Sequence, residues 1–335
     1  MMFETALKEN DQVIVDSRLR DFLPDEVYDI HIHPVDQAHY PPNTMKYLAG
    51  QGTQGAAAYD QAMKLFLPVK TIHGLYFGLP NKAADRPAIN DFVADQAKHH
   101  STPLSRGLML VSPKDDPAVV AAALRGGKFA GIKVYHCYAD RPDTMNARME
   151  EFAPEWMWEL LHETKGLMMM HLVKDDAIAD PENQADIRRL CRRYPNCVLV
   201  LAHIARSFNY RNARDGLHSV ADLENVVVDT SAVCEADAFQ VALRVLGPKR
   251  VLWGTDFPIS HLRGRAITTG RRFFWLHPDG LAASHQAATS TEMTLIGIES
   301  VLCLREACED AGLGRGDIED IFRRNALRIL APHLK

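Results

Sequence analysis

Short apolar runs recur along this chain, and most of them are separated by a segment with apolar residues at helical spacing. Each run is bounded by turn residues and is nearly continuously apolar, which is typical of strands covered on both faces, as in a parallel sheet. The runs occupy residues 27–33, 71–79, 105–111, 129–136, 167–173, 198–204, 225–231 and 250–256. Eight strand–helix units predict an α/β fold, a (β/α)8 TIM barrel with eight parallel strands.

Two connections are too long for ordinary loops. Residues 34–68 follow the first strand and residues 257–291 follow the eighth. Both leave the C-terminal ends of strands, the face on which barrel enzymes carry their sites, so we expect them to wall or cover a pocket. A C-terminal helical region, about 292–331, is expected to pack outside the barrel. Because no linker or repeat divides the chain, residues 1–335 are expected to form a single domain.

Composition and charge narrow the function classes. The chain has 335 residues, 47% of them hydrophobic, with a formal net charge of -5 and no basic stripe, which argues against a nucleic-acid partner. No apolar run approaches the roughly 20 residues of a membrane span, and the N-terminus is polar and acidic, so we expect a cytoplasmic protein with no membrane partner. The sequence leaves open whether the chain forms a homo-oligomer. Six scattered cysteines without a C-x-x-C pair indicate reduced thiols, so a bound metal would use nitrogen and oxygen ligands.

Polar residues gather at the C-terminal ends of the predicted strands. His31 and His33 end the first strand, where alternate side chains share a face, and His171, His203 and Asp256 close the fifth, sixth and eighth strands. Strand eight pairs with strand one in a closed barrel, so Asp256 should neighbour the two histidines. Each residue alone is more often structural, but their convergence predicts a metal site. Its three histidines, His31, His33 and His171, and one carboxylate, Asp256, suit Zn²⁺ or a similar ion.

The motifs that carry these residues resemble those of the amidohydrolase superfamily, specifically its amidohydrolase-related (amidohydrolase 2) branch of TIM-barrel metal-dependent hydrolases. The resemblance covers nearly the whole chain, through "YDIHIHP", "GIKVYH", "MMMHL", "VLVLAHI", "RVLWGTDFP" and "IFRRNALRIL". It implies that His31, His33, His171 and Asp256 bind a single divalent metal, usually zinc. It also implies that His203 hydrogen-bonds the metal-bound water or the substrate.

Lys133 in "GIKVYH" leaves the number of metal ions open. In binuclear members of the superfamily, a carboxylated lysine on this strand bridges two ions, so a second ion through Lys133 is possible here. The alternative is an uncarboxylated Lys133 that orients the substrate or pairs with a carboxylate. The branch that this chain resembles is usually mononuclear, so one ion is expected.

A metal in this cage predicts hydrolysis of an ester, lactone or amide by a metal-activated water. Asp256 would accept the proton of that water and pass it to the leaving group, while His203 and Lys133 would polarise the carbonyl oxygen. The same cage supports non-oxidative decarboxylation or hydration of an unsaturated or aromatic acid, so this lyase chemistry stays open. A non-catalytic barrel is disfavoured because the expected ligand set is complete.

Positive charge near the strand ends gives a hint about the substrate. Arg206 follows the sixth strand, and Arg263 lies in the connection after the eighth. Arginines at the mouth favour a small molecule that bears a carboxylate, through bidentate pairing. Tyr135 and His136 on the fourth strand are candidate lining residues, so we assign Arg206, Arg263, Tyr135 and His136 to substrate binding.

Overall fold

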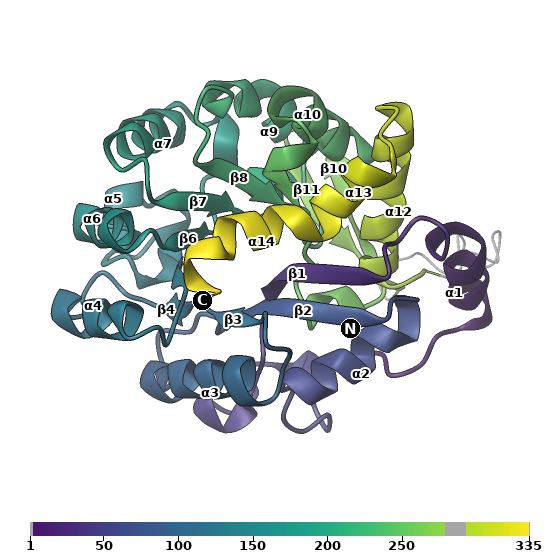
Figure 1. The fold of residues 1–335 in the computed structure, drawn as a ribbon, viewed down its shortest axis with the longest axis horizontal. Coiled ribbons are helices and arrows are strands. Elements are labelled where there is room, and N and C mark those ends of the chain that lie inside the picture. Colours follow the sequence, from purple (N-terminus) through teal and green to yellow (C-terminus); the bar gives the residue numbers. More distant parts are fainter. Residues whose placement is uncertain (1–2, 279–292, 335) are drawn as a thin grey trace.

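The strands form a closed parallel barrel with helices around it (Figure 1). The structure is a computed structural model and describes residues 3–278 and 293–334. The pairing orders are β1-β2-β3 and β4-β5-β6-β7-β8-β9, all parallel. The strands are β1 (Glu26–Ile32), β2 (Thr71–Tyr76), β3 (Arg106–Gly107), β4 (Met109–Leu110), β5 (Gly131–Val134), β6 (Leu167–Met170), β7 (Val198–Leu201), β8 (Val226–Asp229) and β9 (Val251–Leu252).

The barrel is continuous at the two places where strand pairing is interrupted. The third expected strand is divided into β3 and β4 at Leu108, whose amide donates to the Tyr76 carbonyl at 2.8 Å. Between β9 and β1, the Ile30 amide donates to the Trp253 carbonyl at 3.1 Å, and the Asp256 amide donates to the His31 carbonyl at 2.9 Å. These bonds join the ends of the chain's strand series, so the predicted (β/α)8 TIM barrel is confirmed.

The helices cover the outside of the barrel. The long ones are α2 (Ala56–Phe66), α3 (Arg86–His99), α4 (Pro117–Arg125), α6 (Glu155–Thr164), α7 (Pro181–Arg193), α10 (Ala236–Leu246) and α12 (Ile296–Asp310). The short ones are α1 (Glu9–Ile14), α5 (Met149–Phe152), α8 (Ala202–Arg206), α9 (Tyr210–Gly216), α13 (Arg315–Glu319) and α14 (Asn325–Leu330). Three of them, α3, α4 and α7, begin in the same way: an aspartate carboxylate caps the first turn, and a proline lies within that turn. This combination is a strong signal for the start of a helix. The carboxylate accepts from a backbone amide of the first turn, and proline has no amide hydrogen that would need a partner there.

The core has two layers that follow the alternation of side chains along the strands. Tyr28 and Ile30 of β1 pack inside the barrel with residues such as Leu75 and Met169, whereas Val27 and Ile32 pack between the strands and the helices. A side chain on one face of a strand lies in one layer and its neighbour in the other.

The C-terminal region differs in part from the expectation that it packs outside. Helix α12 does lie on the outer layer, against α10. Helix α14, however, contributes Ala326, Ile329 and Leu330 to the cluster inside the barrel. In Figure 1 this helix crosses the end of the barrel that faces the viewer. Helix α14 therefore covers the end of the barrel opposite the C-terminal strand ends, with apolar side chains turned inward.

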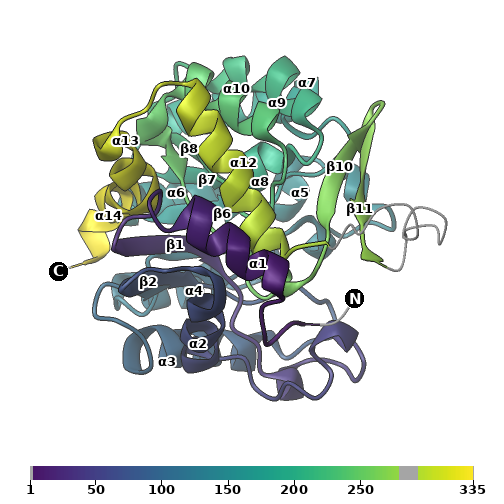
Figure 2. The same ribbon diagram turned by 90° about the vertical axis from the view of Figure 1, so that its right-hand side faces the viewer.

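The two long connections carry structure of their own. Residues 34–68 include helix α2, and the connection after the eighth predicted strand includes an antiparallel hairpin, β10 (Arg265–Thr269) and β11 (Arg272–Leu276). Figure 2 shows this hairpin standing beside the barrel. The rest of that expected connection, residues 279–291, lies outside the described residues. Within the part of the chain that the structure describes, no helix has the length and apolarity to cross a bilayer.

Candidate metal centre

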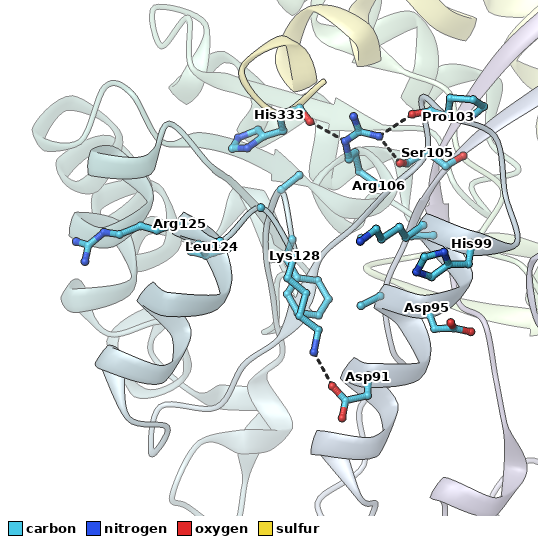
Figure 3. A pocket seen from close by; sticks show the side chains of 18 of the residues that line it. Asp91, Asp95, His99, Pro103, Ser105, Arg106, Leu124, Arg125, Lys128 and His333 are labelled. Atoms are coloured by element: carbon cyan, nitrogen blue, oxygen red, sulfur yellow. Dashed lines mark hydrogen bonds and ion pairs between the residues drawn. The ribbon is translucent and has the colours of Figure 1, made fainter. Parts of the chain in front are cut away.

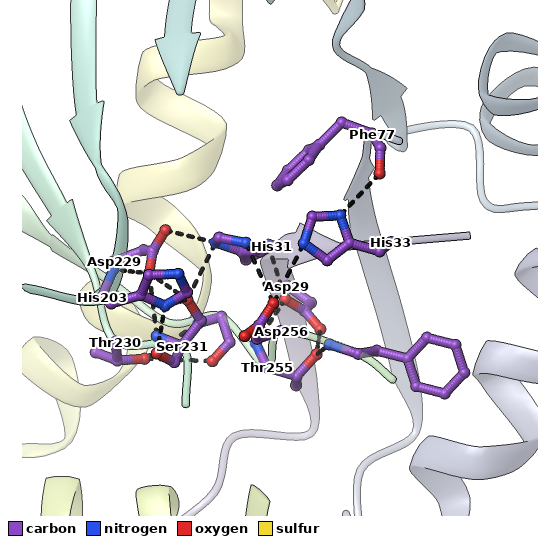
Figure 4. Close-up of polar contacts among 12 residues, drawn as sticks. Asp29, His31, His33, Phe77, His203, Asp229, Thr230, Ser231, Thr255 and Asp256 are labelled. Carbon is purple, nitrogen blue, oxygen red and sulfur yellow. Dashed lines mark hydrogen bonds and ion pairs between the residues drawn. The ribbon is translucent and has the colours of Figure 1, made fainter. Parts of the chain in front are cut away.

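Folding brings Asp256 beside His31 and His33, although more than 200 residues separate it from them in sequence. Nε2 of His33 lies 3.2 Å and Nε2 of His31 lies 3.5 Å from Oδ1 of Asp256 (Figure 4). Gly254 makes this approach possible, because a Cβ at that position would lie 2.9 Å from the Cβ of His31. One ligand atom from each of the three residues lies within 4.8 Å of the others, which is a spacing that a metal ion could use.

A bulge in β1 aims the two histidines. Asp29 pairs with Gly74 and Ile32 pairs with Tyr76, so β1 uses three steps where β2 uses two. One extra residue shifts the alternation, and a β-bulge commonly re-aims side chains beside an active site. Tyr28 and Ile30 therefore stay inside the barrel while His31 and His33 both reach Asp256.

The hydrogen bonds of the imidazoles leave lone pairs facing one another. Nδ1 of His33 lies 3.0 Å from the Phe77 carbonyl oxygen, which can only accept, so Nδ1 carries the proton. Nδ1 of His31 lies 2.9 Å from a carboxylate oxygen of Asp229, with the same consequence. Burial lowers the pKa of His33 and lowers the pKa of His31 to about 3, so both rings are neutral.

Three acceptors therefore converge in a buried place. Among the described residues, Nε2 of His31 has no hydrogen-bond partner. Two neutral Nε2 lone pairs and a carboxylate repel one another unless a cation lies between them. The donor set and the unpartnered nitrogen fit a divalent metal ion.

His171 lies near this cluster but not in its compact part. Its ring centroid lies 5.1 Å from that of His203 and 6.0 Å from that of Tyr135. The close set of potential ligand atoms in the described chain holds His31, His33 and Asp256 without His171. Burial lowers the pKa of His171 well below its usual range, and its Nδ1 meets no hydrogen-bond partner among the described residues. It is thus a neutral, unsatisfied imidazole beside the centre.

His203 is held by Asp229, which the sequence reasoning did not single out, and by Ser231, which is a plausible lining residue from the sequence. Its amide donates to Oδ1 of Asp229 at 2.9 Å, and its Nδ1 lies 2.9 Å from the Ser231 carbonyl oxygen. Asp229, at the end of β8, also contacts His31, so it links the two imidazoles. The signal was present in "NVVVDTS", because Asp229 is a polar residue at a C-terminal strand end like the others.

The segment that carries His203 has an unusual backbone. His203, Ile204, Ala205 and Arg206 have φ values of 58°, 49°, 55° and 60°, so α8 contains a left-handed turn, closed by a bond from the Ser207 amide to the His203 carbonyl at 2.8 Å. A left-handed conformation costs roughly 1–2 kcal/mol for each residue that is not glycine. Strain of this kind is kept where a site needs it, and here the turn sets the separation of His203 from Arg206.

Lys133 is the buried cation of this face. Its side chain is fully buried, and Nζ lies 4.7 Å from the ring centroids of both Phe77 and Tyr135. Nζ has no hydrogen-bond partner within the described ranges. Burial lowers the pKa of Lys133 to about 7, against the opposite pull of Asp229 and Asp256. An unsatisfied lysine with this pKa is able to gain or lose a proton near neutrality.

The four residues that the sequence assigns to substrate binding have different surroundings in the structure. Arg206 donates to the Lys174 carbonyl at 2.7 Å and lies over the Phe273 ring of the hairpin, and no carboxylate pairs with it among the described residues. Tyr135 is buried against His171, and Nδ1 of His136 lies 3.0 Å from the Thr144 carbonyl oxygen. Tyr135 and His136 therefore lie beside His171, with ring centroids 6.0 and 6.3 Å away, whereas Arg206 lies against the hairpin.

Arg263 is placed differently. Its guanidinium donates to Oδ2 of Asp11 at 2.7 Å and to the Met293 carbonyl at 2.8 Å, and only 5% of the residue is exposed. The sequence expectation that Arg263 binds substrate finds no support in this placement, because a buried carboxylate already neutralises it. The ion pair instead ties α1 to the segment after β9.

Hairpin β10–β11 forms an aromatic wall beside His203. Phe208 lies between the site and the hairpin, with ring centroids 5.0 Å from His203, 4.9 Å from Phe273 and 5.3 Å from Trp275. Arg271 pairs with Asp176 at 2.8 Å, which joins the hairpin to the loop after β6. The expected wall after the last strand thus exists in the described part of that connection.

A cavity lies at the opposite end of the barrel from the His31 cluster. It measures about 760 Å³ and is lined by residues of α3, α4 and the C-terminal segment, including Lys98, Arg106, Lys128 and His333 (Figure 3). Arg106 is engaged by the carbonyl oxygens of His333, Pro103 and Ser105, and Lys128 pairs with Asp91. Its Arg106 and Lys128 are therefore engaged by protein groups, unlike Nε2 of His31, which has no hydrogen-bond partner among the described residues.

Comparison with known proteins places the chain in a family. The Amidohydro_2 (amidohydrolase) family model matches residues 28–331. An L-fucono-1,5-lactonase from Burkholderia ambifaria is 26% identical over 176 residues, which are 48% of this chain and 57% of the lactonase. The match therefore spans little more than half the length of that relative.

Two solved structures share the fold. A zinc-bound amidohydrolase from Burkholderia multivorans has a TM-score of 0.58 at 15% identity, covering 91% of this chain and 99% of its own. A 2,6-dihydroxybenzoate decarboxylase in complex with 2,6-dihydroxybenzoate has a TM-score of 0.52 at 14% identity, covering 92% of this chain and all of its own. With the family model matched along most of its length, the chain belongs to the amidohydrolase family of metal-dependent hydrolases.

Proposed function

We propose that this chain uses a metal-activated water to hydrolyse an ester, lactone or amide bond of a small molecule that bears a carboxylate. One observation carries the proposal: the buried Nε2 atoms of His31 and His33 converge on the Asp256 carboxylate with no proton available between them. A metal cation would satisfy that arrangement. The similarity to a lactonase supports hydrolysis of a cyclic ester.

The proposed cofactor is one Zn²⁺ ion per chain. His31, His33 and Asp256 would hold it, and His171 would complete the set of four by turning its unpartnered ring toward them. Imidazole and carboxylate donors suit zinc, and a related structure contains zinc. A second ion bound through a carboxylated Lys133 is the alternative, supported by the buried Nζ atom that has no hydrogen-bond partner among the described residues.

The residues around the metal have separate proposed roles. A bound divalent ion supplies Lewis-acid chemistry and lowers the pKa of a water toward about 7. Asp256 accepts the proton of the attacking water and delivers it to the leaving group. His203 and Lys133 polarise the carbonyl oxygen of the scissile bond. All three groups come from the C-terminal face of the barrel.

Arg206 is proposed to bind the substrate carboxylate, with Tyr135 and His136 as lining residues. Its guanidinium contacts a carbonyl oxygen and an aromatic ring but pairs with no carboxylate in the described chain. A partly buried arginine in this state can still make a charge-assisted pair with a ligand. We further propose that residues 1–335 act as one domain whose partner is a small molecule, since the family match spans residues 28–331.

The second candidate is non-oxidative decarboxylation or hydration of an unsaturated or aromatic acid on the same metal. Two observations favour it: the fold shared with a dihydroxybenzoate decarboxylase, and the aromatic wall of Phe208, Phe273 and Trp275. A non-catalytic barrel remains the least supported candidate, because His31, His33 and Asp256 converge at one end of the barrel.

The test combines metal analysis with a small panel of substrates. We expect about one equivalent of zinc per chain, loss of turnover after chelation and recovery after zinc is added back. The panel contains sugar lactones, neutral esters and hydroxybenzoates, with acid release and carbon dioxide release measured in parallel. Lactone turnover without carbon dioxide supports the hydrolase, and the reverse pattern supports the decarboxylase. Full activity in metal-free protein would contradict both.

A further inference from the structure

Asp229 and Ser231 form a compact hydrogen-bonded hub behind the candidate metal centre. The Asp229 carboxylate faces four donors: the amides of His203 and Ser231 at 2.9 and 3.1 Å, the Ser231 hydroxyl at 2.5 Å and Nδ1 of His31 at 2.9 Å. The Ser231 hydroxyl oxygen also lies 3.0 Å from Nδ1 of His31 and 2.9 Å from Nδ1 of His203. Figure 4 shows the hub between the two rings.

Counting protons in this hub leaves one consistent arrangement. The Ser231 carbonyl can only accept, so Nδ1 of His203 must be the donor in their 2.9 Å contact. An ionised Asp229 can only accept, so the Ser231 hydroxyl and Nδ1 of His31 must both donate to it. The backbone amides of His203 and Ser231 can only donate, and both point at Oδ1 of Asp229, so the carboxylate is the acceptor of this hub. Both imidazoles then carry their proton on Nδ1.

The same atoms could be taken for a second metal site. One ligand atom from each of His31, His203 and Asp229 lies within 4.8 Å of the others. Protein groups, however, already partner these atoms: the Ser231 hydroxyl and Nδ1 of His31 donate to Asp229, and Nδ1 of His203 donates to the Ser231 carbonyl. A proton network therefore explains this cluster without an ion, in contrast to the unpartnered Nε2 of His31 on the other side of the ring.

We propose that Asp229 and Ser231 are positioning residues that hold His31 and His203 in the Nδ1–H tautomer, so that both rings keep an Nε2 lone pair. The hub joins a ligand residue to the residue that would face the substrate. The identity of the metal or substrate that those lone pairs bind rests on the proposed function. The tautomer assignment is independent of that function, because it follows from hydrogen bonds within the protein. Partners of this kind orient metal-ligating imidazoles, and their loss typically lowers metal affinity by about 10–100-fold.

The test measures tautomers in metal-free protein and zinc affinity separately. Protein labelled with ¹⁵N in histidine, after chelation, should show His31 and His203 with a protonated Nδ1 and a bare Nε2. In Asp229→Asn the new amide group can donate toward Nδ1 of His31. We therefore expect His31 to move to the Nε2–H tautomer and zinc affinity to fall by about 10–100-fold.

Two further variants separate positioning from folding. Ser231→Ala removes one donor to Asp229 but keeps the backbone carbonyl, so both tautomers should persist, with a loss of zinc affinity smaller than in Asp229→Asn. Ser300→Ala is the matched control, because its buried hydroxyl donates to the Thr230 carbonyl at 3.3 Å. It should leave the tautomers and the zinc affinity unchanged.

The outcomes distinguish this inference from the proposed function. If the wild-type spectrum shows Nε2–H on either ring, the inference is wrong, and this holds even if Asp229→Asn fails to fold. If Asp229→Asn folds and keeps the wild-type tautomers and zinc affinity, it is also wrong. Correct tautomers in a chain that neither takes up zinc nor turns over a substrate would refute the proposed function and leave the hub intact.

Discussion

Two buried histidines on neighbouring barrel strands have opposite surroundings. His73 of β2 has both ring nitrogens paired at 2.6 Å, Nδ1 with the Thr102 hydroxyl and Nε2 with Glu26, and Glu26 is also paired with Arg323 at 2.9 Å. His31 of β1 has a partner on Nδ1 but none on Nε2 among the described residues. One imidazole is satisfied within the protein, and the other is not.

This difference separates groups that stabilise the fold from groups that are kept for a ligand. Native proteins satisfy nearly all of their buried polar atoms, so each exception needs an explanation. Around His31 the exceptions gather: Nε2 of His31, Nδ1 of His171 and Nζ of Lys133 all have no hydrogen-bond partner in the described chain. Within the described chain, three such atoms at one end of a barrel mark the place where the proposed metal and substrate would bind.

The largest effect is expected from substitutions at the converging lone pairs. His31→Ala and Asp256→Asn should each abolish turnover and bound zinc, because they remove a ligand from the proposed cage. His73→Ala is the matched control from the other cluster and should keep its zinc. Metal content by mass spectrometry and kcat/KM on the best substrate of the panel measure the result. Wild-type zinc content in both site variants would remove the basis of the comparison.

The next effect concerns two buried lysines, one in an ion pair and the other without a hydrogen-bond partner among the described residues. Lys174 is paired with Asp180 at 2.8 Å, whereas Lys133 has no hydrogen-bond partner in the described part of the chain, and burial lowers its pKa from 10.5 to about 7. Between those two pH values the unfolded chain binds a proton that the folded chain does not, so stability rises with pH across that window. The full penalty from Lys133 is present below pH 7.

Lys133→Met should therefore stabilise metal-free protein at pH 6 and lose that advantage as the pH approaches 10.5. The upper limit is about 5 kcal/mol, since one pKa unit corresponds to about 1.4 kcal/mol. Lys174→Met should destabilise the protein, because it leaves Asp180 without its cation. Urea unfolding of chelated samples at pH 6 and pH 9 measures both effects. A Lys133→Met variant that is less stable than wild type at pH 6 contradicts the prediction. The turnover of Lys133→Met should fall, because the lysine proposed to polarise the substrate carbonyl is lost.

A smaller effect is expected at Arg206, the arginine without a carboxylate partner in the described residues. Arg206→Gln should lower kcat/KM for carboxylate-bearing substrates by about 10–100-fold, the equivalent of roughly 1.5–3 kcal/mol for a hydrogen bond to a charged group. The matched neutral ester of the same substrate is the control and should lose much less. Equal losses on the charged and neutral compounds would show that Arg206 does not read the carboxylate.

The smallest effect is expected in the satisfied cluster. Glu26→Gln should lower the free energy of unfolding by about 1–3 kcal/mol, because it weakens the contacts to His73 and Arg323. The pKa of Glu26 is held low chiefly by the hydrogen bond from His73, so the stabilisation is present above the ordinary pKa of a glutamate and is lost as pH falls through the lowered value. Zinc content should not change. A loss of zinc in this variant would mean that the two clusters are coupled.

The sequence by itself determined the barrel and the strand ends that carry chemistry. The alternation of apolar strands and amphipathic helices is a local property, and barrel closure alone brings Asp256 beside His31 and His33. The same rule would also have identified Asp229, since it ends a strand in the same way.

Only the tertiary structure decided which of those polar groups are satisfied. Arg206 and Arg263 are the same residue type in similar positions. Arg206 pairs with no carboxylate among the described residues, whereas Arg263 is neutralised by Asp11, which is 252 residues away in sequence. The bulge in β1, the left-handed turn at 203–206 and the placement of α14 over the barrel end likewise depend on contacts between distant segments. Local sequence limits where a side chain can lie, but its partners come from the whole fold, and the partners determine whether its charge or lone pair is free to act.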